Sequence, residues 1–231
     1  WTADPSIYNG MNGSFDWSNG SHLDMVHATQ YCMGIAYESA NVYWTFNGVG
    51  GILDRYDFGA PHHPGHYDHD DGDITRYRLP LGDELARVEN VPSNMVIADG
   101  ELWVADTGNG RVLRFDLDSP TEVLGSFTSH EGYAGDTVGG IAFGSVLDRA
   151  TLEAEWGGAA EPSGLTVLAD GSLLVGNHAT GHLTLFEADG TIVRTIDTET
   201  GAGLGGLTTV DGVAYFVQMD QRRIVRVDVA E

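Results

Sequence analysis

The sequence contains no lysine. Its eleven basic residues are all arginine, and thirty-four acidic residues outnumber them, which gives a formal net charge of −23. Phosphate backbones and anionic membrane surfaces are bound through clustered cations, so this composition argues against nucleic acid and against a membrane as partners. Two explanations of the acidity stay open. One is a saline habitat, where salt screens the self-repulsion, and the other is an ordinary acidic surface in a chain that uses arginine instead of lysine.

Cysteine and long apolar runs are also scarce. Cys32 is the only cysteine, so no internal disulfide forms, and its apolar surroundings predict a buried small hydrophobic residue. No apolar run approaches the roughly 20 residues of a membrane-spanning helix, and glycine does not recur at every third position as it does in collagen. With 42% hydrophobic residues and 32 glycines, the chain is expected to fold around a core and to contain many turns.

Four segments along the chain share one pattern. Each has a short run of β-forming residues, a polar turn, and a second run that ends in an acidic residue, which is typical of a β-hairpin. The four segments are Asn41–Asp57, Gly100–Asp116, Gly171–Glu187 and Gly212–Asp228. A further strand that opens on small residues precedes each hairpin, at Cys32–Ala36, Pro92–Val96, Pro162–Thr166 and Leu204–Thr208.

Three of the hairpins are followed by one more candidate strand, at Asp73–Leu79, Thr121–Phe127 and Thr191–Ile196. Four antiparallel strands with glycine at the crowded inner corner form one blade of a β-propeller. We therefore predict an all-β fold, a single β-propeller domain over residues 1–231 in which four blades of four strands are recognisable. Uneven spacing of the hairpins predicts insertions at residues 59–72 and 129–156, and the second insertion holds either a helix over Val146–Glu155 or a degenerate blade.

The second hairpin carries the most specific motif. Residues 102–115 read Leu-Trp-Val-Ala-Asp-Thr-Gly-Asn-Gly-Arg-Val-Leu-Arg-Phe. This stretch resembles the NHL-repeat family of β-propellers, in which an apolar strand ends in Val-Ala-Asp and a Gly-Asn turn leads to Arg and the next strand. The likeness spans four units, from Met25 to Val229, and is weakest in the first, where Phe46 replaces the Asp. It implies the six-bladed ring of most relatives, of a bacterial type, with one or two blades in sequence before Trp1, or else a ring that is smaller than usual. Residues 1–20 would then be the remnant of a preceding blade, and a chain that opens on Trp1 would be a fragment or a processed form.

The densest group of potential metal ligands is the segment His62–Asp73, which holds four His and four Asp in twelve residues. Imidazole nitrogens suit Zn or Cu, whereas carboxylate oxygens suit Ca. The spacing matches neither a helical zinc motif nor an EF-hand loop, so a solvated acidic turn stays open as the alternative. The candidate ligands here are His62, His63, His66, Asp68, His69, Asp70 and Asp71, and a second candidate pair, His22 and His27, precedes the first inner strand.

Further candidates follow from the repeat itself. Phe46, Asp106, Asn177 and Gln218 are assigned to the same position in successive hairpins, so we expect the three polar side chains, with His178 beside Asn177, to face a ligand. A polar residue at a strand end also accepts hydrogen bonds from the next turn, which is a purely structural alternative. Gluconolactonase-like propellers hold a divalent cation with Glu, Asn and Asp from separate blades, and that resemblance implies Asn94 as one such ligand.

Two functional hypotheses follow. The first is a rigid platform that binds a small molecule or a protein, with a divalent metal at the His-rich loop and no organic cofactor. The alternative is a metal-dependent hydrolase or lyase with its site at the propeller channel, which requires ligands from several blades to converge. The acidic composition suits a secreted or periplasmic protein, and the cytoplasm of a salt-loving cell is equally compatible.

Overall fold

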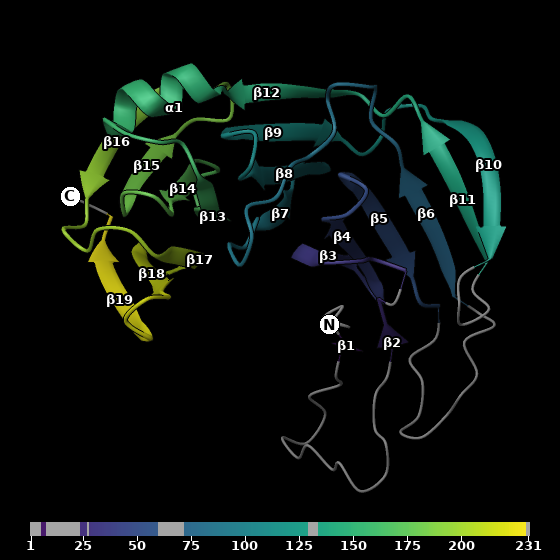
Figure 1. Ribbon diagram of the computed structural model, residues 1–231, viewed down its shortest axis with the longest axis horizontal. Helices are drawn as coiled ribbons and strands as arrows, with labels where there is room; N and C mark the ends of the chain where they lie inside the picture. Colours follow the sequence, from purple (N-terminus) through teal and green to yellow (C-terminus); the bar gives the residue numbers. More distant parts are fainter. Residues whose placement is uncertain (1–5, 8–23, 27, 60–71, 129–133, 230–231) are drawn as a thin grey trace, which may run out of the picture. The chain divides into compact units, whose positions relative to one another are not determined.

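The computed structural model describes residues 6–7, 24–26, 28–59, 72–128 and 134–229 (Figure 1). β-Strands dominate these residues, and they contain one α-helix, α1 (Arg149–Trp156). The chain divides into two compact units, of which the first comprises residues 1–84 and 121–140 and the second comprises residues 85–120 and 141–231. Within the described ranges, no helix is long and apolar enough to cross a membrane.

The first unit contains a six-stranded sheet, the first sheet, with the strand order β10-β11-β6-β5-β4-β3. Its strands are β3 (Cys32–Ser39), β4 (Val42–Asn47), β5 (Ile52–Asp57), β6 (Asp73–Tyr77), β10 (Glu122–Thr128) and β11 (Ala134–Gly139). Strands β3 to β6 are antiparallel neighbours in chain order, whereas β11 runs parallel to β6 with Thr137 opposite Arg76. A two-stranded pair, β1 (Ser6–Ile7) and β2 (Asp24–Met25), also belongs to this unit.

A polar cluster is buried on one face of the first sheet. The fully buried carboxylate of Asp54 accepts hydrogen bonds from the Thr29 hydroxyl at 2.8 Å and from Arg76 Nε at 2.7 Å. The hydroxyl of Tyr56 lies 2.9 Å from the same Thr29 oxygen. A buried charge is tolerated when it is paired and hydrogen-bonded, and both conditions hold for Asp54.

The second unit contains three sheets. The second sheet has the order β12-β9-β8-β7, the third β13-β14-β15-β16 and the fourth β17-β18-β19. Their strands are β7 (Met95–Ala98), β8 (Glu101–Asp106), β9 (Arg111–Asp116), β12 (Phe143–Leu147), β13 (Pro162–Val167), β14 (Leu173–Asn177), β15 (His182–Phe186), β16 (Ile192–Asp197), β17 (Leu204–Val210), β18 (Val213–Gln218) and β19 (Arg223–Asp228). All neighbouring strands in these sheets are antiparallel, as four-stranded blades require.

Tight turns fix the register of these hairpins. Asp99 and Gly100 connect β7 to β8 with φ of 52° and 79°, and Asp211 and Gly212 connect β17 to β18 with φ of 50° and 76°. Positive φ at both central residues is the geometry of a two-residue hairpin turn, and Asp-Gly is a preferred sequence for it. Local turn chemistry therefore sets the register between each of these predicted hairpins and the strand that precedes it.

The cores of the second unit lie between its sheets. Trp103, Leu165 and Phe186 belong to an apolar cluster shared by the second and third sheets, and Leu174, Leu207 and Phe216 belong to one shared by the third and fourth. Helix α1 adds Leu152 and Trp156 to the first of these clusters, and the Trp156 indole donates to the Thr184 hydroxyl at 2.8 Å. Asp148 caps the helix by accepting from the Thr151 backbone N–H at 2.8 Å. Of the segment Val146–Glu155, for which a helix or a degenerate blade was predicted, the part from Arg149 onward is helical, whereas Val146 and Leu147 belong to β12.

The structure corrects one predicted strand pairing. The prediction that Thr121–Phe127 forms the outer strand of the second blade is wrong. This segment forms β10, which pairs with β11 in the first sheet, and β12 pairs with β9 as the outer strand of the second sheet. The stretch 129–156, predicted as an insertion, therefore supplies β12, the fourth strand of the second sheet. Both segments have β-forming composition, and such local signals do not specify a partner strand. The segments at Asp73–Leu79 and Thr191–Ile196 do form the expected strands, β6 and β16.

Candidate functional site

One position recurs at the end of the second strand in each sheet. It holds Asp106, Asn177 and Gln218, as predicted, but in the first sheet it holds Asn47 and not Phe46. The register shows this directly, since Asn47 pairs with Ile52 just as Asp106 pairs with Arg111. Phe46 is instead a fully buried apolar residue. The assignment of Phe46 was wrong by one residue, and in a strand one residue moves a side chain to the opposite face.

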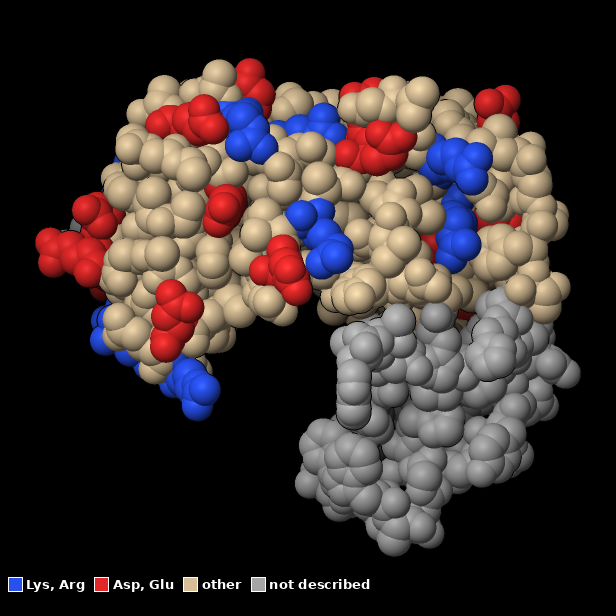
Figure 2. Space-filling view, in the orientation of Figure 1, with Lys and Arg blue, Asp and Glu red and all other residues tan. Residues whose placement is uncertain are grey.

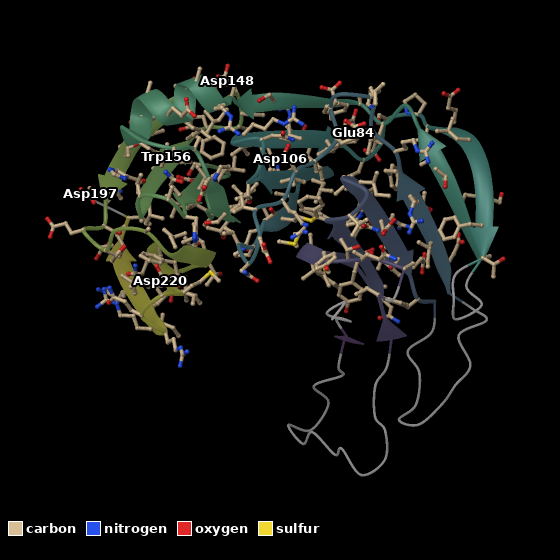
Figure 3. All side chains as sticks on the ribbon, in the orientation of Figure 1. Glu84, Asp106, Asp148, Trp156, Asp197 and Asp220 are labelled. Carbon is tan, nitrogen blue, oxygen red and sulfur yellow. The ribbon has the colours of Figure 1, made fainter. Side chains whose placement is uncertain are left out.

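All four side chains at this position are buried and hydrogen-bonded within the protein. Asp106 accepts from the Ala86 backbone N–H at 2.8 Å, from Asn109 Nδ2 at 2.8 Å and from Arg111 Nε at 2.7 Å (Figure 3). Burial raises the pKa of the Asp106 carboxyl, and these three hydrogen bonds oppose the rise. The Asp and the Arg of the NHL-like motif thus form an ion pair across their own hairpin.

The equivalent residues make the same kind of connection. Asn177 accepts from the Glu161 N–H and donates to the Ala159 carbonyl, and Gln218 Nε2 donates to the Thr200 and Ala202 carbonyls. Asn47 Nδ2 lies 3.3 Å from the carbonyl oxygen of Ala28. Each side chain therefore ties the end of one strand to the segment that leads into its sheet. These contacts give Asp106, Asn177 and Gln218 a structural role, and their predicted contact with a ligand stays a prediction.

The residue after this position links neighbouring sheets in the second unit. Thr107 donates its hydroxyl proton to the Pro162 carbonyl at 2.7 Å, and the ring nitrogen Nδ1 of His178 lies 3.0 Å from the Leu204 carbonyl oxygen. A carbonyl oxygen only accepts, so Nδ1 is the donor in this contact and Nε2 is the second polar atom of the ring. Among the described residues, Nε2 has no hydrogen-bond partner. His178 is thus held in orientation and retains one free functional atom.

Asn94 differs from Asp106, Asn177 and Gln218 because its side-chain amide has no hydrogen-bond partner in the part of the chain that the structure describes. Its backbone is fixed, since its N–H donates to the Ser163 carbonyl at 2.8 Å and its carbonyl accepts from the Ala105 N–H at 2.9 Å. Its half-buried side chain makes no hydrogen bond to any residue in the described ranges. The amide therefore offers two donors and an acceptor to a ligand.

Asn94 lies on the wall of a pocket of about 330 Å³ in the second unit. The other lining residues come from the fourth sheet and are Gly206, Leu207, Thr208, Tyr215, Phe216, Val217 and Ile224. None of these carries a charge, and most are apolar. A mainly apolar pocket with a few neutral polar groups is the usual form of a small-molecule site. This geometry suits an uncharged ligand with one group that hydrogen-bonds to the Asn94 amide.

The predicted metal ligands lie outside the described residues. This holds for the whole set in the His-rich loop, His62, His63, His66, Asp68, His69, Asp70 and Asp71, and for His22 and His27. Within the described part of the chain, no group of three or more His, Cys, Asp or Glu side chains is placed to hold a metal ion. Metal binding at the loop therefore stays a prediction.

The sequence did not predict the fourth-sheet wall of the pocket. Tyr215, Val217 and Ile224 are the unexpected members, because alternation separates the two faces of a strand without showing which face packs against a neighbouring sheet. Ala214 and Phe216 belong to the buried cluster, while Val217 and Ile224 are 43% and 74% exposed. The one sequence signal was the pair Gly205-Gly206, because small residues at an inner corner leave space beside the backbone.

No protein-family model matches the chain, and no curated protein matches it either. Solved structures do resemble it. A streptogramin B lyase shares 13% identity at a TM-score of 0.51, with 86% of this chain covered. A luciferin-regenerating enzyme shares 11% identity at a TM-score of 0.50, with 85% covered. The match spans 55% of the length of each of these two structures. Together with the four-stranded antiparallel sheets, this likeness shows a β-propeller fold.

Proposed function

We propose that this protein is an NHL-type β-propeller that binds a small, uncharged and largely apolar molecule in the pocket beside Asn94. The observation that carries the proposal is the Asn94 amide, which has no hydrogen-bond partner among the described residues and lies on the wall of a pocket that they line without a charge. A ligand that hydrogen-bonds to this amide would gain a contact that the protein itself does not already use. The NHL assignment is supported by the ion pair between Asp106 and Arg111, which joins the Asp that ends the first strand of the motif to the Arg that follows its turn.

Two further parts of the proposal rest on sequence. The His-rich loop His62–Asp73 would bind a divalent cation, supported by its density of imidazole and carboxylate groups. A secreted or periplasmic location is supported by the acidic composition. The alternative function, a metal-dependent hydrolase or lyase, depends on that loop, since His178 has no converging metal ligands among the described residues.

Ligand-observed NMR with a panel of neutral aromatic amides and lactams tests the pocket. Asn94→Leu keeps the approximate side-chain size and removes the amide, so the members that bind wild-type protein should lose saturation transfer. Gly206→Leu should abolish binding by placing a side chain in the pocket, because a Cβ there approaches only the Asn94 amide, at 3.9 Å.

Gly144→Leu is the matched control, because a Cβ at this glycine of β12 meets nothing within 4 Å. This variant should bind the panel as wild-type protein does, and unchanged melting temperatures would establish that all three variants fold. The proposal is wrong if no member of the panel binds wild-type protein, or if binding survives both pocket substitutions.

A further inference from the structure

The backbone of Ser163, the second residue of β13, is fixed to the second sheet. The Thr107 hydroxyl donates to the Pro162 carbonyl at 2.7 Å, and the Asn94 N–H donates to the Ser163 carbonyl at 2.8 Å. Two successive carbonyls of β13 are thus held by groups of the second sheet. Ser163 is fully buried, and hydrogen bonds shielded from water hold their partners firmly. The main chain of Ser163 therefore has one defined position beside Asn94.

The side chain of Ser163 reaches in the other direction, to the fourth sheet. Its hydroxyl donates to the Leu204 carbonyl at 2.7 Å, and its contact with the Gly176 carbonyl oxygen is longer, at 3.3 Å. The Leu204 carbonyl also accepts from His178 Nδ1 at 3.0 Å. Leu204 is the first residue of β17 and is fully buried. Two side-chain donors, from β13 and from the turn after β14, therefore determine where this strand begins.

The stretch of β17 that follows Leu204 departs from regular pairing. The register against β18 shifts between Leu204 and Leu207, so the two intervening residues, Gly205 and Gly206, lie opposite the single residue Val217. This arrangement is a β-bulge, and glycine gives its backbone more conformational freedom than any other residue. The position of the Gly205-Gly206 bulge therefore depends on how firmly its ends are held, and the Leu204 carbonyl lies at one of these ends.

The bulge forms part of the wall of the pocket beside Asn94. A Cβ at Gly206 would lie 3.9 Å from both the nitrogen and the oxygen of the Asn94 amide, so the amide lies close to the bulge. Acidic side chains are spread over the face of the molecule in Figure 2, whereas the described pocket lining carries no charge. Selection among ligands therefore depends on the fit between the bulge and the amide, and not on charge.

We propose that Ser163 is a positioning residue of this pocket, which fixes the Gly205-Gly206 bulge opposite Asn94 and thereby determines the size of the group that fits between them. Ser163 does not line the pocket itself. It connects the two walls, because its carbonyl accepts from the Asn94 N–H and its hydroxyl donates to the Leu204 carbonyl. This role rests on the ligand site proposed above and adds the residue that sets its selectivity.

The position of the bulge can be tested without a ligand. Ser163→Ala keeps the backbone carbonyl and removes the hydroxyl, so Leu204 loses its shorter side-chain hydrogen bond and the bulge should exchange between positions. ¹⁵N relaxation dispersion at Gly205 and Gly206 should therefore be flat in wild-type protein and become measurable in this variant. Circular dichroism melts establish that the variant folds.

Ser172→Ala is the matched control for Ser163→Ala. Ser172 is also buried, but its hydroxyl donates to Asp170 at 2.6 Å in the turn between β13 and β14, and it does not line the pocket. The same chemical change at this position should leave the dispersion profiles of Gly205 and Gly206 flat.

Affinities for two related probes test the selectivity. Oxindole and 3,4-dihydroquinolin-2-one are neutral aromatic lactams that differ by one ring methylene, and wild-type protein should bind one of them about tenfold more tightly than the other. In Ser163→Ala this ratio should fall below about threefold, because a mobile bulge accepts both rings. His178→Ala removes the longer hydrogen bond to Leu204 and should reduce the ratio less, and Ser172→Ala should keep the wild-type ratio.

The outcomes separate the ligand site from the role of Ser163. If wild-type protein binds neither lactam nor any other member of the panel, the ligand site is wrong and the positioning role is wrong with it. If wild-type protein binds both lactams equally, or if Ser163→Ala keeps the wild-type ratio, only the positioning role is overturned. Flat dispersion at Gly205 and Gly206 in folded Ser163→Ala protein would overturn it as well.

Discussion

The hydroxyl of Thr107, in the turn after β8, donates to the carbonyl oxygen of Pro162 at the start of β13, and both groups are buried. The same Thr107 oxygen lies 2.7 Å from the Ser93 hydroxyl. This short chain of hydrogen bonds joins the second sheet to the third. A buried polar link of this kind fixes the arrangement of two packed sheets because breaking it leaves buried groups unpaired.

Replacement of Thr107 by Val should destabilise the protein. The shape of the side chain is kept, but the Pro162 carbonyl loses its hydroxyl donor and the Ser93 hydroxyl loses a partner, at a cost of about 1–3 kcal/mol in the free energy of unfolding. Urea denaturation measures this change. Thr209→Val is the control, because the Thr209 hydroxyl has no hydrogen bond among the described residues. Equal stabilities of the two variants would show that the link contributes nothing.

Gly164 tests how closely the inner strands β13 and β17 pack. A Cβ at this glycine would lie 2.5 Å from Leu207 Cβ and 2.8 Å from the Gly205 carbonyl oxygen. The obstacle includes backbone, which cannot rotate away, so Gly164→Ala should lower the free energy of unfolding by about 1–3 kcal/mol. Gly144→Ala meets nothing within 4 Å and should change stability by no more than about 0.5 kcal/mol. A fully stable Gly164→Ala variant would contradict the close approach of these strands.

The buried carboxyl of Asp106 should make stability depend on pH. Its pKa in the folded protein is raised by burial, so it holds its proton to a higher pH than in the unfolded chain, where the reference pKa is 3.8. Its contribution to stability is therefore complete below that value and is lost as the pH rises through the folded pKa. Asp106→Asn stays neutral throughout. The stability of wild-type protein relative to this variant should fall as the pH increases from 3 to 7, and a constant difference would argue against the shift.

Cys32 should be a poor nucleophile in the folded protein. Burial, with a smaller contribution from the charge of Asp54, raises the pKa of the thiol from 9.0 to about 11. At pH 8 the thiolate fraction is then about 100-fold lower than in the unfolded chain. Labelling with a disulfide reagent should therefore be about 100-fold slower in buffer than in concentrated urea. Similar rates in the two solvents would show that the thiol is neither buried nor shifted.

The His-rich loop should account for metal bound by the purified protein. A variant with His62, His63, His66 and His69 all replaced by Ala loses the imidazole ligands, and its metal content by elemental analysis should fall by at least half. His178→Ala and His182→Ala should retain the wild-type metal content, because neither residue belongs to the loop. Unchanged stoichiometry in the fourfold variant would reject the loop as the site.

The sequence predicted what local chemistry determines. The short polar turn between Asp106 and Arg111 specifies the predicted hairpin without reference to the rest of the chain. Pairing between distant segments is not specified by local sequence. In the pairing of β6 with β11, for example, Arg76 lies opposite Thr137, and sixty residues separate the two. Several strands have suitable composition for such a partner, so the pairing depends on the packing of the whole unit.

The candidate site was predictable only in part. Asn94 was identified through its likeness to a metal ligand in other propellers, whereas its surroundings indicate a neutral organic ligand. Asp106 and Asn177 were predicted to face a ligand because they recur in the repeat, and the structure shows that their side chains make hydrogen bonds within the protein. Sequence reveals which residue recurs, but whether its polar atoms are already paired depends on segments such as Ala86 and Glu161 that carry no motif.

The parallel pairing of β6 with β11 also constrains how the chain is made. Residues 85–120, which intervene, build most of the second sheet, so a ribosome delivers those strands before β11 emerges to cover β6. The first sheet therefore cannot be completed until the residues that build the second sheet have been synthesised. During that interval β6 lacks its β11 partner, and an unpaired strand edge of this kind favours aggregation of an incomplete chain.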